Sequence, residues 1–378
     1  MDIRFGLVST YPPTRCGIAT FSSSLMSAIR QLGHHAVQVV RLIEPSLDTK
    51  SLGASSDVVA TLKAGNHESI VDAIEVLNCT DVAIVQHEFG IYGGEDGDEV
   101  LALLRGLRVP SIVVLHTVLA SPSGHQRAVF TELCARSSVI VTMSRVARQR
   151  LLVNYQVDPR KVVIVPHGAR EFSLKSRTPI ADPPIILTWG LIGPGKGIEW
   201  AIEAMGLIRD LDPAPHYVVA GGTHPKVFER ERESYREALQ ARIDELELSD
   251  WVHLQSGYLP SHQLDALIAS SSVVLLPYDS LDQVTSGVLI EAISAWRPIV
   301  ATRFPHAVEL LSGNVGILVP HRNPVELAQA LRRVLEQPEL AATLSRRTGA
   351  LADELRWSSV AARYLQIAER LIRTMAIA

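Results

Sequence analysis

A run near residue 290 carries groups suited to binding a nucleotide. Ser286 and Gly287 are predicted to open a helix, after the apolar strand Val273–Leu276 and a polar loop. The free N–H groups and the dipole at a helix start attract anions. Glu291 lies about one turn further on, where a carboxylate suits sugar hydroxyls better than phosphate. A phosphate at the helix start and a ribose on Glu291 describe a nucleotide; a serine-capped helix with a surface glutamate is the alternative.

A glycine-rich loop with a single lysine is the second candidate phosphate site. The sequence GLIGPGKGIEW follows the predicted strand Ile185–Trp189, and its glycines, Gly193 among them, surround Lys196. A loop of this kind before a helix cradles phosphate with backbone N–H groups and one ammonium. It differs from the P-loop, in which Ser or Thr follows the lysine.

Polar residues also follow three apolar strands of the N-terminal half. These candidates are Gly17 in TYPPTRCGIATF, His87, Glu88, Tyr92 and Gly93 in QHEFGIYGGEDG, and His116 directly after Ile112–Leu115. Carboxyl ends of parallel strands meet at one edge of a sheet, where ligands of such sheets bind. A glycine-rich loop with an aromatic residue and a carboxylate suits a sugar, so a site is predicted at this edge. A structural role for each residue is the alternative.

Asp96-Gly97-Asp98 has the spacing of the DxD motif that holds a divalent metal in some sugar transferases. It lies where a helix is predicted to begin, and acids in a first turn are favoured by the helix dipole. We therefore interpret both aspartates as helix-start acids and predict no metal site.

The composition is that of a globular protein without a strong field. Among 378 residues, 47% are apolar and 20% are charged, and the net charge of −4 gives no reason to expect nucleic acid as a partner. Three scattered cysteines without metal spacing favour a reducing, cytoplasmic setting. No apolar run reaches the length of a membrane span, so at most peripheral membrane association is expected.

The elements that position these residues alternate strand and helix in two runs, which predicts an α/β protein with two parallel sheets covered on both faces. A charged, proline-rich stretch at 168–184 is the predicted linker. We expect domains at 1–170 and 171–355, and a final amphipathic helix, 356–378, that packs back on the first domain. The charged stretch 227–247 is predicted to be one long, solvated helix.

Together these features resemble the GT-B glycosyltransferases, and most closely the retaining family 4 group. The resemblance rests on the glycine turn, the strand-end His, VTMSRVAR, VPHG, GLIGPGKG, the SGVLIEA helix and the terminal Trp helix. It implies two Rossmann-like domains facing a cleft, a nucleotide-sugar donor on the C-terminal domain and an acceptor on the N-terminal one. It also implies that no metal is needed, because protein donors neutralise the leaving diphosphate.

The resemblance assigns roles to individual residues. Lys196 and His116 are the catalytic candidates, the first at the donor phosphates and the second near the transferred sugar. Glu291 matches the second glutamate of the family's Glu-x7-Glu motif, which holds the ribose. The remaining donor-side residues are Gly17, Gly193, Tyr258, Gln283, Ser286 and Gly287, and the acceptor-side residues are His87, Glu88, Tyr92 and Gly93.

Two positions depart from the family pattern. Gln283 stands in place of the motif's first glutamate, and it keeps hydrogen-bonding ability but no charge. Leu191 stands where an arginine usually follows the glycine, which removes one phosphate cation. No substitute for that arginine can be named from the sequence.

The resemblance implies a retaining hexosyltransferase that uses a GDP-mannose or UDP-glucose type of donor and a sugar or lipid-linked acceptor. A nucleotide-sugar epimerase and a phosphorylase are alternative GT-B enzymes. A nucleotide-sugar binding protein with weak or lost catalysis is a further alternative, supported by the two departures.

Overall fold

The computed structural model describes residues 2–44, 55–172 and 181–377, and it divides into two compact units. Unit 1 comprises residues 1–168 and 356–378, and unit 2 comprises residues 169–355. The sequence placed these boundaries at 170/171 and 355/356. Part of the predicted linker, residues 173–180, lies outside the described residues.

In the described part of unit 1, seven parallel strands form a sheet in the order β3-β2-β1-β4-β5-β6-β7. The order reverses between β1 and β4, so the loops that follow these two strands flank the switch point at which ligands of such sheets bind. The strands are β1 Arg4–Ser9, β2 Ala36–Ile43, β3 Val58–Lys63, β4 Val82–His87, β5 Ser111–Leu115, β6 Val139–Thr142 and β7 Val162–Ile164.

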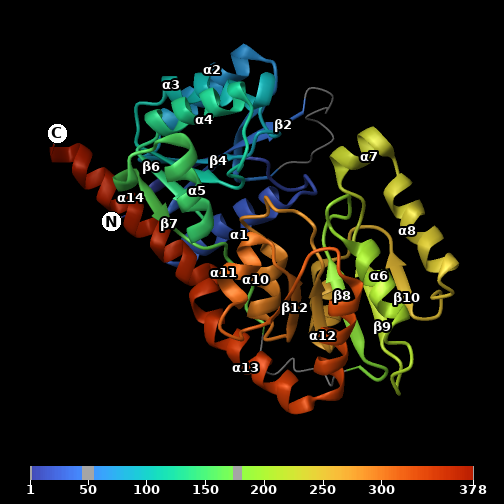
Figure 1. Ribbon diagram of the computed structural model, residues 1–378. Helices are drawn as coiled ribbons and strands as arrows, with labels where there is room; N and C mark the ends of the chain where they lie inside the picture. Colours follow the sequence, from blue (N-terminus) through green and yellow to red (C-terminus); the bar gives the residue numbers. More distant parts are fainter. Residues whose placement is uncertain (1, 45–54, 173–180, 378) are drawn as a thin grey trace. The chain divides into compact units, whose positions relative to one another are not determined.

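Helices cover both faces of this sheet. On one face, Phe5, Leu7 and Ile84 pack with apolar residues of α1 and of α14, the long helix that ends the chain (Figure 1). On the other face, Leu77 of α2 lies against Gly6 of β1. The helices are α1 Gly17–Gln31, α2 His67–Asn78, α3 Glu99–Gly106, α4 Gly124–Arg136, α5 Arg145–Tyr155 and α14 Trp357–Ile377.

In the described part of unit 2, six parallel strands form a sheet in the order β10-β9-β8-β11-β12-β13. Here the switch point lies between β8 and β11, which are the strands that lead into the glycine loop and into the Ser286 helix. The strands are β8 Ile185–Trp189, β9 His216–Ala220, β10 Val252–Gln255, β11 Val273–Leu276, β12 Ile299–Thr302 and β13 Ile317–Val319.

The helices of unit 2 also divide between the two faces of its sheet (Figure 1). Residues of α6, α8 and α12 share one apolar core with the sheet, and residues of α9, α10 and α11 share the other. The helices are α6 Ile198–Gly206, α7 Pro225–Glu231, α8 Ser234–Glu245, α9 Ser261–Ser270, α10 Gly287–Ser294, α11 Pro305–Leu311, α12 Pro324–Glu336 and α13 Pro338–Leu355.

The predicted helix over 227–247 is wrong in one respect, because the chain forms two helices there. The backbone of Arg232, with φ of +54°, breaks the stretch between α7 and α8. The second helix is not simply solvated, since Leu239 and Ile243 are buried in the core. The break leaves α7 as a short separate helix after the loop that follows β9.

Candidate functional site

The glycine loop and the start of α10 come together at the switch point of unit 2. A Cβ on Gly190 would lie 3.3 Å from Cγ2 of Val288, in the first turn of α10. The amide of Asp279, in the loop between β11 and α10, donates to the carbonyl of Gly195 (2.9 Å). The two phosphate-binding elements that the sequence indicated are therefore neighbours.

Lys196 is held over an aromatic face in this arrangement. Its Nζ lies 4.1 Å from the centroid of the Tyr278 ring, a cation–π contact. Tyr278 follows β11 and is 1% exposed, so it offers a fixed surface for the ammonium. The loop bends tightly beside it: a Cβ on Gly197, where φ is +64°, would lie 2.0 Å from the carbonyl oxygen of Pro277. Only glycine fits that position.

The start of α10 has backbone amides that are open to a ligand, but the amide of Ser286 is already used within the protein. The Ser286 amide donates to Nδ1 of His306 (2.9 Å), and its hydroxyl accepts from the Leu289 amide (3.2 Å). The Ser286 amide is therefore already engaged within the protein, and its predicted phosphate contact stays a prediction. The amides of Gly287 and Val288 donate to no acceptor among the described residues, so they are the open donors.

Glu291 is fixed from two sides. Its Oε2 accepts from Nε1 of Trp189, the last residue of β8 (3.0 Å), and its Oε1 accepts from Nη2 of Arg170 (3.2 Å). Nη1 of Arg170 also lies 2.8 Å from Oδ1 of Asp265, which orients the guanidinium. The Glu291 side chain keeps 22% of its surface exposed, so it is not sealed from solvent.

The other predicted donor-side residues vary in their surroundings. Tyr258 is 55% exposed after β10. The side-chain amide of Gln283 donates to the carbonyl of Thr285, and the backbone carbonyl of Gln283 accepts from the His306 amide (3.3 Å). Gly193 is buried, and its carbonyl accepts from the Lys196 amide (3.2 Å). Gly17 opens α1 in unit 1, where a Cβ would meet no heavy atom within 4 Å.

In unit 1, His116 follows β5 and is held by Gln86. Its Nε2 lies 2.7 Å from Oε1 of Gln86, and its ring meets that of Phe21 edge-on at 5.0 Å. With Gln86 as acceptor, Nε2 carries the hydrogen and Nδ1 the lone pair. Burial, and then the nearby His167 and His87, lower the pKa of His116 to about 3. His116 is therefore neutral near pH 7.

Two predicted acceptor-side residues are core residues instead. His87 is completely buried between Phe89, Tyr92 and Phe130, and burial lowers its pKa to about 3. Tyr92 is 6% exposed and donates its hydroxyl to the carbonyl of Gln86 (2.7 Å). His87 ends β4 and Tyr92 follows it, and both side chains are buried in the core, so their acceptor-side roles stay predictions.

Glu88 and Gly93 remain in the loop after β4. The carboxylate of Glu88 accepts from the hydroxyl of Thr117 and from the amide of Phe89 (3.1 Å). The carbonyl of Gly93 accepts from the Glu99 amide (3.3 Å). Glu88 is thus linked to the residue next to His116, across two neighbouring strand ends.

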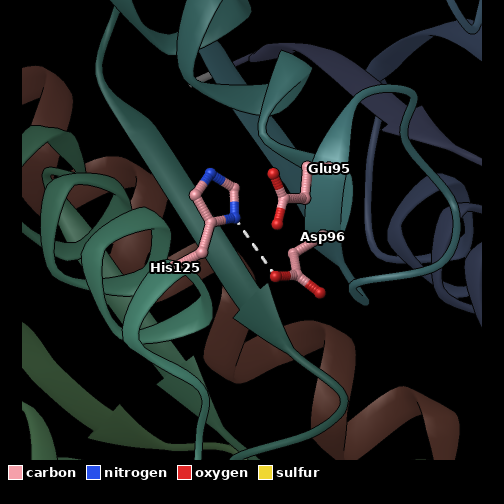
Figure 2. A group of neighbouring side chains, drawn as sticks. All are labelled: Glu95, Asp96 and His125. Carbon is pink, nitrogen blue, oxygen red and sulfur yellow. Dashed lines mark hydrogen bonds and ion pairs between the residues drawn. The ribbon is translucent and has the colours of Figure 1, made fainter.

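Asp96 and Asp98 both approach a histidine of α4. Nδ1 of His125 lies 3.1 Å from Oδ2 of Asp96, and Nε2 lies 3.7 Å from Oδ2 of Asp98. Figure 2 shows Glu95, Asp96 and His125 turned toward one another. One ligand-type atom of each residue lies within 4.8 Å of those of the other two. Oδ1 of Asp96 also accepts from Gln126 (3.1 Å), so this carboxylate is shared within the protein. The absence of a metal requirement stays a prediction.

The sequence did not indicate four residues that hold these groups. They are Trp189, Arg170, His306 and Gln86. Trp189 had a usable signal, since it ends the strand before the glycine loop. Arg170, His306 and Gln86 each contact a residue that is distant in the sequence, and Gln86 is also buried inside β4. A single sequence gives no indication of such partners.

The chain resembles known glycosyltransferases in sequence and in fold. Residues 169–349, just under half of the chain, match the family model described as glycosyl transferases group 1. The alpha-D-kanosaminyltransferase of Streptomyces kanamyceticus is 30% identical over 175 residues, which are 46% of this chain. The match spans only 42% of that relative's length.

Two solved structures share the fold over almost the whole chain. A glycosyltransferase from Rickettsia africae has a TM-score of 0.76 at 15% identity, covering 98% of this chain and 99% of its own. The Anabaena protein Alr3699/HepE, solved in complex with UDP, has a TM-score of 0.73 at 16% identity, covering 98% of this chain and 99% of its own. The family match and the fold confirm the predicted resemblance to the GT-B glycosyltransferases.

Proposed function

We propose that this chain, whose residues 169–349 match glycosyl transferases group 1 and whose fold is GT-B, is a retaining glycosyltransferase. It transfers a hexose from a nucleoside diphosphate sugar to a hydroxyl of a carbohydrate or lipid-linked acceptor. The observation that carries the proposal is the meeting of Lys196, the open amides of α10 and Glu291 at the switch point of the family-matched unit. UDP is the first nucleotide to test, because Alr3699/HepE holds it.

The proposed chemistry asks the protein for charge stabilisation and positioning. The bond between the sugar and the diphosphate breaks, the acceptor oxygen bonds to the same carbon, and the acceptor proton passes to the departing phosphate. Negative charge grows on the leaving oxygen, so Lys196 and the amides of Gly287 and Val288 stabilise the transition state. Glu291 accepts hydrogen bonds from the ribose and fixes the nucleotide.

Lys196→Ala is the variant that tests the donor site. Removing one well-placed donor of developing charge costs on the order of 10²–10³ in rate, and Leu191 provides no second cation in the loop. Lys196→Arg restores only part of the rate, because a planar fork does not reproduce a compact ammonium. The measurements are the dissociation constant of the nucleoside diphosphate and the transfer rate. If both stay within about threefold of wild type, well short of that loss, the phosphates bind elsewhere.

A catalytically weak nucleotide-sugar binding protein is the second candidate. Leu191 and Gln283 favour it, because Gln283 carries no charge and directs its amide at the carbonyl of Thr285. Donor hydrolysis or transfer above background, lost in Lys196→Ala, would exclude this candidate.

Metal independence is part of the proposal, because protein donors and amides neutralise the leaving group. Transfer should therefore continue at an unchanged rate in excess EDTA. Loss of activity that Mn²⁺ or Mg²⁺ restores would contradict this, and Glu95, Asp96 and His125 would then be the residues to substitute.

A further inference from the structure

The glycine loop of the proposed phosphate site carries one cation, Lys196. Within residues 190–197, Lys196 is the only basic side chain, and Leu191 occupies the position at which the family's arginine is expected. A diphosphate carries two to three negative charges near neutral pH, so a second positive group would improve its binding.

The loop after β9 lies directly against the glycine loop. The Ile192 amide donates to the carbonyl of Gly222 (2.9 Å), and the His224 amide donates to the carbonyl of Ile192 (2.7 Å). A Cβ on Gly193 would lie 3.8 Å from the Cβ of His224. The His224 side chain therefore begins on the flank of the loop that carries Lys196.

The imidazole of His224 has one nitrogen in use and one available. Its Nδ1 accepts from the Lys226 amide (3.3 Å), which caps α7 and leaves the hydrogen on Nε2 in the neutral ring. Nε2 makes no hydrogen bond with the described residues. The ring is partly exposed, so Nε2 is available as a donor to a bound anion.

Two lysines and a glutamate act electrostatically on the His224 ring. Burial, and then the charges of Lys196 and Lys226, lower the pKa of His224, whereas Glu229 acts in the opposite direction. Glu233, directly before α8, and Arg236 of α8 contact the same loop: Glu233 accepts from the hydroxyl of Thr223, and Arg236 donates to the carbonyl of Gly221. An anion placed between Lys196 and His224 would oppose the burial and the repulsion that lower the pKa of this ring.

We propose that His224 is a second phosphate-contacting cation of the donor site, which takes up a proton when the diphosphate binds and replaces the arginine absent at position 191. This inference rests on the proposed function. It predicts that His224 takes up a proton when the nucleoside diphosphate binds. Because the bound ring is protonated and the free ring is neutral, affinity falls as pH rises through the interval between the two pKa values.

His224→Asn is the matched variant for testing this proposal. Asparagine is a favourable N-cap, so it keeps the contact with α7 while removing the titratable ring. The probes are UDP and uridine, with the dissociation constant of each measured by calorimetry at about pH 6 and about pH 8, either side of an ordinary histidine pKa. Proton uptake is measured from the dependence of the binding heat on the buffer. Exposed His34, at the turn before β2, provides the control variant His34→Asn.

The measured quantity is the ratio of the UDP dissociation constant of His224→Asn to that of wild type. This ratio should be about tenfold larger at the lower pH than at the higher one, which corresponds to a pKa shift of one unit. The comparison with His224→Asn removes the titration of UDP itself. Uridine, which has no phosphate, should bind both proteins equally. Leu191→Arg should restore UDP affinity to His224→Asn, because it supplies the missing charge from the other side of the loop.

The inference would be overturned by equal pH dependence and equal proton uptake in wild type and His224→Asn. Equal losses of UDP and uridine binding would also overturn it, since they indicate a structural role. In either case Lys196→Ala should still weaken UDP binding, and the proposed function would stand. If wild type binds no nucleoside diphosphate at all, the proposed function and the inference both fail.

Discussion

At the scale of single residues, Glu291 differs most from the expectation that the sequence gives. A surface glutamate could be removed at little cost to folding. Here its carboxylate accepts from Trp189 and from Arg170, so removal leaves two partly buried donors without their acceptor. Binding and stability are therefore coupled at this residue.

Glu291→Ala should weaken binding of a nucleoside diphosphate by about 1.5–3 kcal/mol and should lower the unfolding free energy by about 1–3 kcal/mol. Calorimetry and urea unfolding measure the two effects. A nucleotide without ribose hydroxyls separates the roles: it should bind wild type and variant equally. If the ribonucleotide also binds both equally, the ribose contact is wrong.

His116 is expected to act as a neutral hydrogen-bonding group. Its depressed pKa, about 3, means that it does not titrate between about pH 5 and pH 8. His116→Ala should therefore reduce turnover far more than donor affinity, and the pH profile of the wild-type rate should show no inflection from this ring. Rates and dissociation constants for the two proteins check this. Normal turnover in a folded His116→Ala variant would leave His116 a structural residue.

At the scale of elements, α14 supports the strand ends of unit 1. The Trp357 ring at its start contacts Gly168, and it meets Phe21 at 5.0 Å. Phe21 in turn meets both His116 and His167 at 5.0 Å. The final helix thus fixes the aromatic ring against which His116 rests.

Gly168→Ala tests this packing, because a Cβ at Gly168 would lie 2.3 Å from the Trp357 ring. We expect a loss of about 1–3 kcal/mol from overpacking. The same change in a Trp357→Ala background should cost less than about 0.5 kcal/mol, because the clash is gone. Gly124→Ala, where a Cβ meets nothing within 4 Å, is the control. Equal costs of Gly168→Ala in both backgrounds would contradict the contact.

The sequence predicts elements where apolar residues are continuous. The buried strands Ile112–Leu115 and Val273–Leu276 match β5 and β11 closely for that reason. It gave no indication of β3, whose residues are mostly half-exposed, and it joined α7 to α8 because charged residues continue through Arg232. The His306 contact that occupies the Ser286 amide depends on tertiary packing, which local patterns do not encode.

At the scale of the whole molecule, the buried histidines of unit 1 should make its unfolding free energy fall in acid. Burial lowers the pKa of His87 and of His116 to about 3, and that of His167 to about 4. Each is neutral in the folded protein near pH 5, whereas an unfolded histidine is charged below about pH 6.5. Their contribution to stability is therefore fully present above about pH 6.5 and is lost as pH falls toward the folded values. Among the described helices, none is long and apolar enough to cross a membrane.

His87→Phe should remove the part of this sensitivity that His87 contributes. His87 is completely buried against Phe89 and Phe130, and neither ring nitrogen has a hydrogen-bond partner among the described residues, so a phenyl ring suits the position. Between about pH 6.5 and pH 5 a buried neutral histidine costs about 2 kcal/mol of unfolding free energy. The drop in stability over that interval should therefore be smaller by about 2 kcal/mol in His87→Phe than in wild type or in His34→Asn. Identical drops in all three proteins would show that His87 takes up its proton in the folded state.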